Sequence, residues 1–373
     1  MSVSIGIVGL PNVGKSTLFN ALTDNNILAA NYPFATIDPN TGIVPIPDVR
    51  LDNLEKLYNA KKKVNATVTF VDIAGLVAGA SKGEGLGNQF LANIRSCNAI
   101  AHVVRAFDDP NVLTDEATGS HEPAKDIDII NTELVLADLQ TVEKRLPVMQ
   151  KEARANPKLQ PNAQFLEEVK HILDSGTPLF AGLSDEGEGL REWLQKELQL
   201  ITLKPVIYVF NVDEATLQDE AKKQELAQLA ARQGGTDEAH PACVFICAKL
   251  ESELRGLDDS DRAELLESYG VTESGLSSLI HAAYDSLGLQ SYLTAGEQEV
   301  RAWTVKRGAT APQAAGVIHG DFERGFIAAQ VVDYNDLMAT GSEQAAKAAG
   351  KVRTEGKTYI MRPDDVVEFR FNV

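Results

Sequence analysis

The groups that could do chemistry begin near the N-terminus, in the stretch GLPNVGKST at residues 9–17. This stretch fits Gly-x-x-x-x-Gly-Lys-Ser and separates a strand-like apolar run from a predicted helix over residues 16–22, which is the context of a phosphate-binding loop. Gly9 and Gly14 let the backbone turn tightly enough for successive N–H groups to face phosphate oxygens, and the helix N-terminus adds its positive dipole end. Lys15 is expected to reach the β- and γ-phosphates and to take part in catalysis. The predicted phosphate site consists of Asn12, Val13, Gly14, Lys15, Ser16 and Thr17.

A second group of residues could hold a magnesium ion beside these phosphates. The Ser16 hydroxyl is the metal ligand that the loop motif supplies. Asp72 ends the run VTFVD and begins Asp-x-x-Gly, so its carboxylate is expected to hold Mg²⁺ through water. Thr36, in NYPFATIDPNTG, is the expected switch threonine that completes the metal shell in the triphosphate state. The N–H of Gly75 is expected to touch the γ-phosphate, as a further catalytic group.

The residue after Gly75 bears on the rate of hydrolysis. Ras-like GTPases carry a glutamine there, which orients the attacking water. This sequence has Leu76, whose side chain cannot hydrogen-bond water. Hydrolysis is therefore predicted to be slow or to depend on another group that positions the water.

The stretch NVDEAT at residues 211–216 stands where a GTP-binding protein carries Asn-Lys-x-Asp. In that tetrapeptide the Asp carboxylate accepts two hydrogen bonds from guanine, and the Lys stem packs along the base. Here Val212 replaces the Lys and Glu214 replaces the Asp, so discrimination in favour of guanine should be lost. The predicted base site consists of Asn211, Val212 and Glu214, with Ala248 and Lys249 from the later stretch ICAK.

These residues require an α/β domain to position them. Short apolar, β-branched runs such as SIGIVG, AIAHVVRAF and PVIYVFN alternate with helical stretches such as residues 51–58. Several of the runs are continuous rather than alternating, as in parallel strands that are covered on both faces. The pattern predicts a P-loop NTPase fold with a doubly wound, mostly parallel sheet, formed by residues 1–126 and 203–287.

Two further regions differ in character from this domain. Residues 127–202 contain two amphipathic runs, 127–150 and 162–173, separated by prolines, which predicts an inserted helical hairpin of the coiled-coil type. Residues 288–373 contain short alternating strands, glycine-rich turns and one small helix near residues 342–349, which predicts a compact α+β module.

Composition excludes several classes of protein. The net charge of −18 argues against general binding to nucleic acid, and DNA is not an expected partner. The charge is uneven, because residues 289–373 carry 11 acidic and 10 basic residues. Five of these bases lie in residues 347–362, and this local cluster is the part of the sequence that suits a polyanion contact. No apolar run is long enough to span a bilayer, and no targeting segment is recognised, so we expect neither a membrane contact nor export.

Cys97, Cys243 and Cys247 lack metal-ligand spacing and are expected to be incidental or buried thiols of a cytoplasmic protein.

In combination, GLPNVGKST, FATIDPNTG, DIAGLVAGASKGEGLGN, a helical insertion, NVDE and the C-terminal module resemble the YchF/Obg-like ATPase family over essentially the whole chain. The resemblance implies a translation-factor-class P-loop domain, a C-terminal β-grasp (TGS) domain, ATP in preference to GTP, and Mg²⁺. It also implies association with the ribosome through the TGS and helical regions, and we expect a monomer. Glu214 matches the altered base motif of the family, and Leu76 matches its hydrophobic replacement of the catalytic glutamine. Where the family places a candidate catalytic histidine, seven residues after Phe107, this chain has Thr114, and His121 in the same loop is the remaining candidate.

Three alternatives remain open. An Obg-type GTPase with a degenerate base motif is consistent with the phosphate motifs, although Val212 and Glu214 disfavour it. A nucleotide-gated adaptor for RNA or protein, with incidental turnover, is consistent with slow hydrolysis and the C-terminal bases. A metabolite kinase would share the loop motif, but the order of the motifs that follow it argues against this class.

Overall fold

The computed structural model describes residues 3–24, 40–73, 86–107, 122–183, 188–233, 241–254 and 256–372. The chain forms two compact units. Unit 1 contains Met1–Ile43 and Thr69–Ala283, and unit 2 contains Val44–Val68 and Tyr284–Val373. The helical insertion groups with unit 1, and residues 44–68, which we expected in the P-loop domain, group with the C-terminal part of the chain.

A six-stranded sheet forms the centre of unit 1. Its strand order is β2-β4-β1-β5-β6-β7. Neighbouring strands run parallel from β4 to β7 in this order, which confirms the doubly wound α/β fold. Because the carboxyl ends of parallel strands meet at one edge of a sheet, the segments that follow β1, β4 and β6 gather there. The strands are β1 (Ser4–Val8), β2 (Thr41–Pro45), β4 (Thr67–Asp72), β5 (Ala99–Ala106), β6 (Val206–Val212) and β7 (Ala242–Ile246).

Helices pack against this sheet through a shared apolar core. Val8, Tyr208 and Phe210 of the strands are fully buried in a cluster with Ile94 and Ile130 of the helices. The continuous burial of β5 and β6 is that of strands covered on both faces. The helices are α1 (Lys15–Asp24), α3 (Leu86–Ser96), α8 (Glu214–Gln218), α9 (Glu220–Gln233), α10 (Ala248–Glu253), α11 (Asp259–Ser268) and α12 (Gly275–Ser286).

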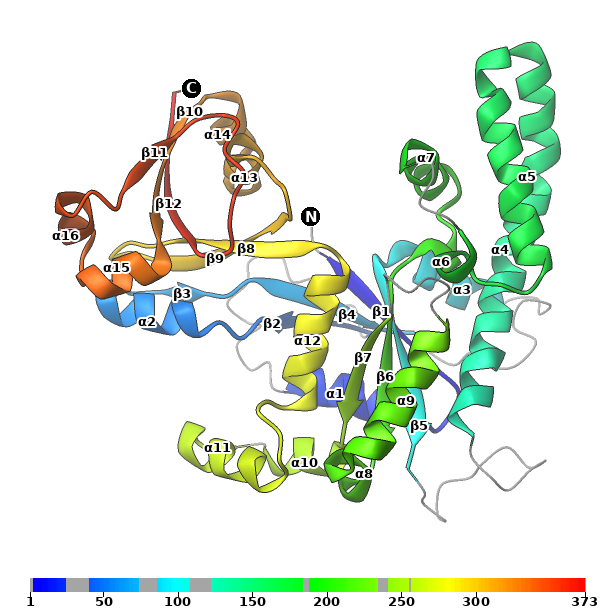
Figure 1. The fold of residues 1–373 in the computed structure, drawn as a ribbon, viewed down its shortest axis with the longest axis horizontal. Coiled ribbons are helices and arrows are strands. Elements are labelled where there is room, and N and C mark those ends of the chain that lie inside the picture. Colours follow the sequence, from blue (N-terminus) through cyan, green and yellow to red (C-terminus); the bar gives the residue numbers. More distant parts are fainter. Residues whose placement is uncertain are drawn as a thin grey trace. The chain divides into compact units, whose positions relative to one another are not determined.

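The insertion is a helical hairpin with a core of its own. Helix α4 (Pro123–Ala155) and helix α5 (Gln160–Asp174) lie side by side and antiparallel, with a 3₁₀ turn at Pro157–Leu159 between them (Figure 1). The first turns of α4 belong to the core of the sheet, whereas its later turns pack with α5, α6 (Leu179–Gly182) and α7 (Glu188–Leu198) in a separate apolar cluster. Both predicted runs lie inside α4 and α5, and Pro147 is accommodated within α4. None of the described helices is long and apolar enough to cross a membrane.

The C-terminal part of unit 2 has the β-grasp arrangement. Its sheet has the order β11-β10-β12-β8-β9-β3, in which β8 is antiparallel to β9 and parallel to β12. Helix α13 (Ala311–Ile318) connects β9 to β10 and packs on both, with Ala311, Ala314 and Ala315 fully buried. The predicted small helix is α16 (Glu343–Ala348), but the prediction of one helix was wrong, because the described part of this region contains three more. The remaining elements are β8 (Leu289–Thr294), β9 (Val300–Lys306), α14 (Gly320–Arg324), β10 (Phe326–Asp333), α15 (Tyr334–Thr340), β11 (Arg353–Glu355) and β12 (Asp365–Phe371).

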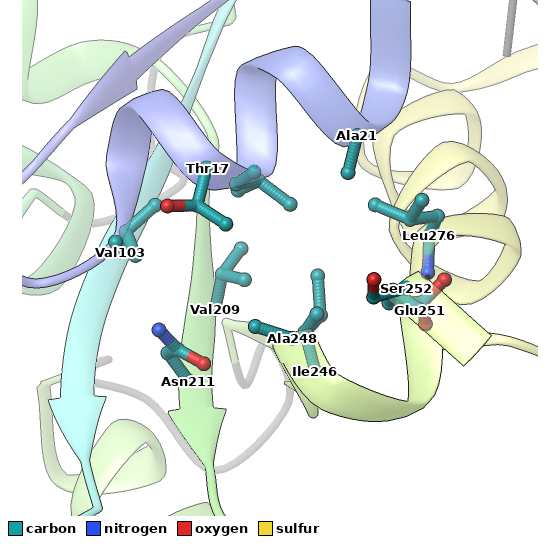
Figure 2. Close-up of a pocket in the computed structure, with 12 residues that line it drawn as sticks. Thr17, Ala21, Val103, Val209, Asn211, Ile246, Ala248, Glu251, Ser252 and Leu276 are labelled. Carbon is teal, nitrogen blue, oxygen red and sulfur yellow. Dashed lines mark hydrogen bonds between the residues drawn. The ribbon is translucent and has the colours of Figure 1, made fainter. Parts of the chain in front are cut away.

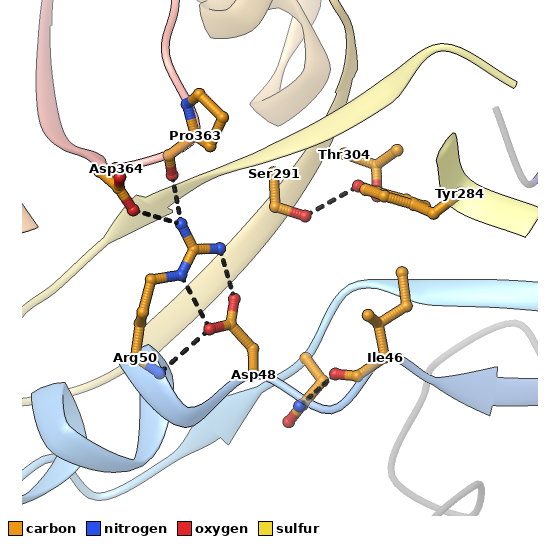
Figure 3. A network of polar contacts seen from close by, with 9 residues as sticks. Ile46, Asp48, Arg50, Tyr284, Ser291, Thr304, Pro363 and Asp364 are labelled. Atoms are coloured by element: carbon orange, nitrogen blue, oxygen red, sulfur yellow. Dashed lines mark hydrogen bonds and ion pairs between the residues drawn. The ribbon is translucent and has the colours of Figure 1, made fainter. Parts of the chain in front are cut away.

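Residues 44–68 complete this unit. Within them, α2 (Val49–Tyr58) packs on β9, and β3 (Lys63–Val64) pairs in parallel with β9. The Arg50 guanidinium donates two hydrogen bonds to Asp48 at 2.9 and 2.7 Å, and its remaining terminal nitrogen donates to the Pro363 carbonyl at 2.5 Å and to Asp364 at 3.0 Å (Figure 3). Arg50 thereby joins positions more than 300 residues apart in the chain.

Candidate nucleotide-binding site

The loop between β1 and α1 has the geometry of a phosphate cradle. A Cβ atom added at Gly9 would lie 2.4 Å from the Val103 carbonyl oxygen of β5, so only glycine lets the loop approach the sheet so closely. Asn12 adopts a left-handed conformation with φ of 62°, which turns the loop back toward α1. The loop therefore ends at the N-terminus of α1, where unpaired N–H groups and the helix dipole favour an anion.

Lys15 lies folded over this loop. Its ammonium donates hydrogen bonds to the carbonyls of Gly9 at 2.9 Å and Leu10 at 2.6 Å. Burial lowers the pKa of Lys15, and the nearby Asp72 carboxylate opposes that shift. A buried ammonium whose hydrogen-bond acceptors among the described residues are neutral carbonyls would gain from a charged acceptor, because hydrogen bonds between two charged groups are stronger. The geometry therefore suits a phosphate oxygen beside Lys15.

Oxygen ligands for a magnesium ion lie next to the same loop. Asp72 ends β4 and is paired with Ile7, two residues before Gly9. Burial raises the pKa of the half-buried Asp72 carboxylate, and Lys15 opposes the rise. The exposed Ser16 lies in the first turn of α1. A hydroxyl and a carboxylate are the hard oxygen ligands that Mg²⁺ prefers, with water and phosphate oxygens in its remaining positions. The residues present therefore fit the metal, although the described residues contain no cluster of three or more His, Cys, Asp or Glu side chains that could hold an ion alone.

Asn211 links the phosphate loop to the end of β6. Its side-chain nitrogen donates to the Val13 carbonyl at 3.1 Å. A Cβ atom at Gly14, whose φ is 100°, would lie 2.4 Å from that nitrogen. The Asn211 side chain can therefore take this position only because residue 14 is a glycine. The amide nitrogen faces the loop, and the amide oxygen faces the opposite side, toward Ala248 (Figure 2).

A cavity of about 160 Å³, here called the Asn211 cavity, begins on that opposite side. It extends from Gly14, Thr17, Asn211 and Ala248 toward the middle of α1 and the N-terminus of α12. Glu251, at its far end, accepts a hydrogen bond from the N–H of Gly275 at 2.7 Å and so caps α12. The apolar part of its lining consists of Leu18, Ala21, Val103, Val209, Ile246 and Leu276.

Comparison with known proteins agrees with this architecture. A family model described as "50S ribosome-binding GTPase" matches residues 4–137, and the YchF-GTPase_C model, described as "Protein of unknown function (DUF933)", matches residues 289–372. Curated relatives named "Ribosome-binding ATPase YchF" are 49% identical in Bacillus subtilis and 48% identical in Escherichia coli O157:H7, over 100% of both chains. The chain belongs to the YchF family. The solved structure of the Schizosaccharomyces pombe YchF GTPase is 36% identical and superposes with a TM-score of 0.85, covering 99% of this chain and 98% of that one.

The base end of this YchF-family site differs from the expectation for individual side chains. Val212 is only 3% exposed and belongs to the apolar core, so only its backbone is available to a ligand. The Glu214 carboxylate forms an ion pair with Lys249, which also lies 3.9 Å from Glu253. Neither Glu214 nor Lys249 lines the Asn211 cavity, whereas Asn211 and Ala248 do. Asp213, between the two predicted base contacts, instead caps α8 by accepting from the N–H of Thr216 at 2.8 Å.

Five of the residues singled out from the sequence lie outside the described part of the chain. They are Thr36 of the switch stretch, Gly75 and the following Leu76, and Thr114 and His121 between β5 and α4 in sequence. Conversely, sequence reasoning missed the walls of the cavity. Val209 is a strand residue without any motif, and Leu276 lies more than sixty positions after Asn211. Ile246 begins the stretch ICAK, but only Ala248 and Lys249 of that stretch were predicted as base contacts.

Proposed function

We propose that this YchF-family protein is a Mg²⁺-dependent ATP hydrolase that prefers ATP to GTP and acts as a slow conformational switch on the ribosome. The observation that carries the base preference is the orientation of Asn211, whose nitrogen is engaged by the Val13 carbonyl and whose oxygen faces the cavity. An oxygen in that position accepts a hydrogen bond from the 6-amino group of adenine but repels the 6-oxo oxygen of guanine. Adenine therefore complements the site, and guanine leaves an acceptor facing an acceptor.

The fourth residue of the base motif supports the same conclusion. A guanine reader needs a carboxylate free to accept two hydrogen bonds from the base. In this protein the Glu214 carboxylate is instead neutralised by Lys249. Binding of guanine would have to break this ion pair, so the pair disfavours GTP without obstructing adenine.

Mg²⁺, when bound, would neutralise charge on the β- and γ-phosphates. Ser16 and, through water, Asp72 would hold it, and we propose Thr36 as the third contributor. Lys15 and the Gly75 N–H are the proposed groups on the transferred phosphate. Hydrolysis is proposed to be slow because Leu76 replaces the water-orienting glutamine, with His121 as the candidate that remains in this chain.

The proposed partner is the ribosome, because the relatives over the full length of the chain carry that name. A ribosomal role would place the protein in the cytoplasm, and we propose that it acts as a monomer through its β-grasp and helical regions. The C-terminal basic cluster is less free than its sequence indicates. Lys347, Lys351 and Arg353 form ion pairs with Glu343, Asp336 and Glu355. Net charge alone therefore does not identify the contact surface.

Calorimetric titration with non-hydrolysable ATP and GTP analogues, with Mg²⁺ and with excess EDTA, tests the proposal. We expect the ATP analogue to bind at least about tenfold more tightly, as a mismatched buried acceptor would require, and EDTA to weaken binding. Equal or inverted affinities would favour the Obg-type GTPase instead. Turnover of His121→Ala and Thr114→His then tests the loop, since rates unchanged by both substitutions would remove it from catalysis.

The adaptor alternative has its own test. Cosedimentation with ribosomes, comparing the wild type with Lys15→Ala, asks whether nucleotide controls the association. If neither the substitution nor added ATP changes the amount of protein that cosediments with ribosomes, turnover is incidental to the association.

A further inference from the structure

The Asn211 cavity extends well past the amide oxygen of Asn211, which is the proposed contact for the base. Beyond Asn211 it continues along α1 to Ala21 and across to Leu276, in a space of about 160 Å³. An apolar protein cavity of about 150 Å³ is enough to bind a benzene ring. The described lining is mainly aliphatic, and Leu18, Ala21, Ile246 and Leu276 are each less than 9% exposed.

The few polar groups of the cavity lie at its ends. Asn211 and Thr17 lie at the end near the phosphate loop, and Glu251 and Ser252 lie at the opposite end (Figure 2). Glu251 is already engaged by α12. The middle of the cavity therefore offers dispersion contacts rather than hydrogen bonds, which suits an alkyl or aryl group.

The position of the amide oxygen of Asn211 determines which part of a nucleotide would reach this space. If that oxygen accepts from the 6-amino group of adenine, the amino nitrogen lies at the mouth of the cavity. A monosubstituted amino group keeps one N–H for the oxygen and carries its substituent on the same nitrogen. The substituent is then directed beyond Asn211, between Val209 and Ile246.

We propose that the Asn211 cavity is a subsite for an alkyl or aryl substituent on the 6-amino group of an adenine nucleotide, so that the protein accepts N6-monosubstituted ATP. This inference rests on the proposed binding of ATP and extends it to a class of substrate. Ala21 sets the size limit, because it lines the cavity on the side away from Asn211 (Figure 2).

Calorimetric titration of the full-length protein with four ligands tests the subsite: ATP, GTP, N6-benzyl-ATP and N6,N6-dimethyl-ATP. We expect N6-benzyl-ATP to bind within about threefold of ATP, because removal of the apolar ring from water offsets the cost of ordering the substituent in the cavity. N6,N6-dimethyl-ATP, although smaller, has no N–H for Asn211 and should bind about tenfold more weakly than ATP. The comparison therefore separates room for a group from the need for a donor.

Two variants locate the subsite. Ala21→Leu adds three carbons to the cavity wall and should weaken N6-benzyl-ATP relative to ATP by about tenfold or more, as overpacking requires. Ser252→Phe should also narrow the cavity and weaken N6-benzyl-ATP relative to ATP. Because Ser252 is exposed, this variant can fold without repacking the core. The readout is the ratio of the two dissociation constants within each variant, and a general loss of nucleotide binding cancels in it.

The outcomes separate the inference from the function on which it rests. If ATP binds more tightly than GTP but N6-benzyl-ATP binds more than about thirtyfold more weakly than ATP, the subsite is absent and the proposed ATPase stands. The same conclusion follows if N6-benzyl-ATP binds well and neither variant changes the ratio. If ATP does not bind more tightly than GTP, the proposed base preference is overturned, and the proposed subsite is overturned with it.

Discussion

The phosphate end and the base end of the site are built in different ways. At the proposed phosphate end, the candidate groups are backbone N–H groups and one buried lysine, and the loop is fixed by its close approach to Val103. At the proposed base end, the candidate groups are side chains, and two of them, Glu214 and Lys249, are 39% and 62% exposed and pair with each other. Backbone geometry tolerates few substitutions, whereas exposed side chains can change singly. A P-loop protein can therefore change its base preference by substitution of side chains while its phosphate-binding loop stays the same.

The largest effect that this contrast predicts is at Lys15. Lys15→Ala removes a buried cation from the phosphate end, and we expect the affinity for ATP to fall about 100-fold, as for loss of a charged hydrogen bond. Lys158→Ala, an exposed lysine of the helical hairpin, is the matched control and should bind ATP as the wild type does. A loss below fivefold in Lys15→Ala, measured by calorimetry, would contradict the role of Lys15.

Gly14→Ala tests whether the two ends are mechanically joined. The new Cβ would collide with the Asn211 side-chain nitrogen at a backbone φ of 100°, so both the loop and the base contact must shift. We expect ATP affinity to fall about thirtyfold and the free energy of unfolding to fall by about 2 kcal/mol. Gly176→Ala is the control, because Gly176 also has positive φ, 79°, but open space around its Cβ position. Equal destabilisation of the two variants would mean that the collision contributes nothing.

A buried histidine of β5, beside the strand that leads into the phosphate loop, predicts that the free energy of unfolding depends on pH. His102 of β5 is fully buried and pairs with Val8, and burial, with a smaller contribution from Lys15, lowers its pKa from 6.5 to about 3. The unfolded chain therefore binds a proton that the folded chain does not between these two values. Stability rises with pH across this window, and His102 alone should cost about 2 kcal/mol on going from pH 7 to pH 5.

Denaturant unfolding of the wild type and of His102→Gln at both pH values checks this contribution. The variant should lose less stability between pH 7 and pH 5 than the wild type does. Identical losses would show that His102 does not remain neutral in the folded state.

Asn211→Ala sharpens the comparison from the base end. Removal of the amide should weaken ATP about tenfold and leave GTP affinity nearly unchanged, because guanine gains nothing from the acceptor. The ratio of ATP to GTP affinity is the measurement. A parallel loss for both nucleotides would mean that Asn211 serves only to hold the loop through Val13.

The smallest expected effect is at the exposed ion pair. Glu214→Gln removes the partner of Lys249, but exposed ion pairs contribute only about 0–1 kcal/mol. We expect no measurable change in unfolding and at most about a fivefold gain in GTP affinity, measured by titration. A tenfold loss of ATP affinity would show that Glu214 contacts the nucleotide directly.

Local patterns predicted where the residues of the proposed phosphate end lie in the fold, because a glycine-rich loop between a strand and a helix is marked by its own sequence. The glycines, Lys15 and Ser16 occupy the predicted loop and helix, and Asp72 ends the predicted strand. The long helices were also accessible from periodicity. The base end was less accessible, because whether Val212 points to the ligand or to the core depends on packing with helices far along the chain. The two-residue strand β3 could not be recognised, since its partner β9 follows it by more than two hundred residues.

The interleaving of the chain limits how this protein can be divided or recombined. Residues 44–68 lie between Ser16 and Asp72 in sequence but fold with β9, and Leu51 and Leu54 of α2 are fully buried there. A protein ended at residue 288 would expose that helix and leave Arg50 without Asp364 and Asn53 without Tyr334. We therefore expect a truncation at the family-model boundary to be insoluble. The C-terminal region is therefore not an independent appendage, because an internal segment of the chain completes its fold.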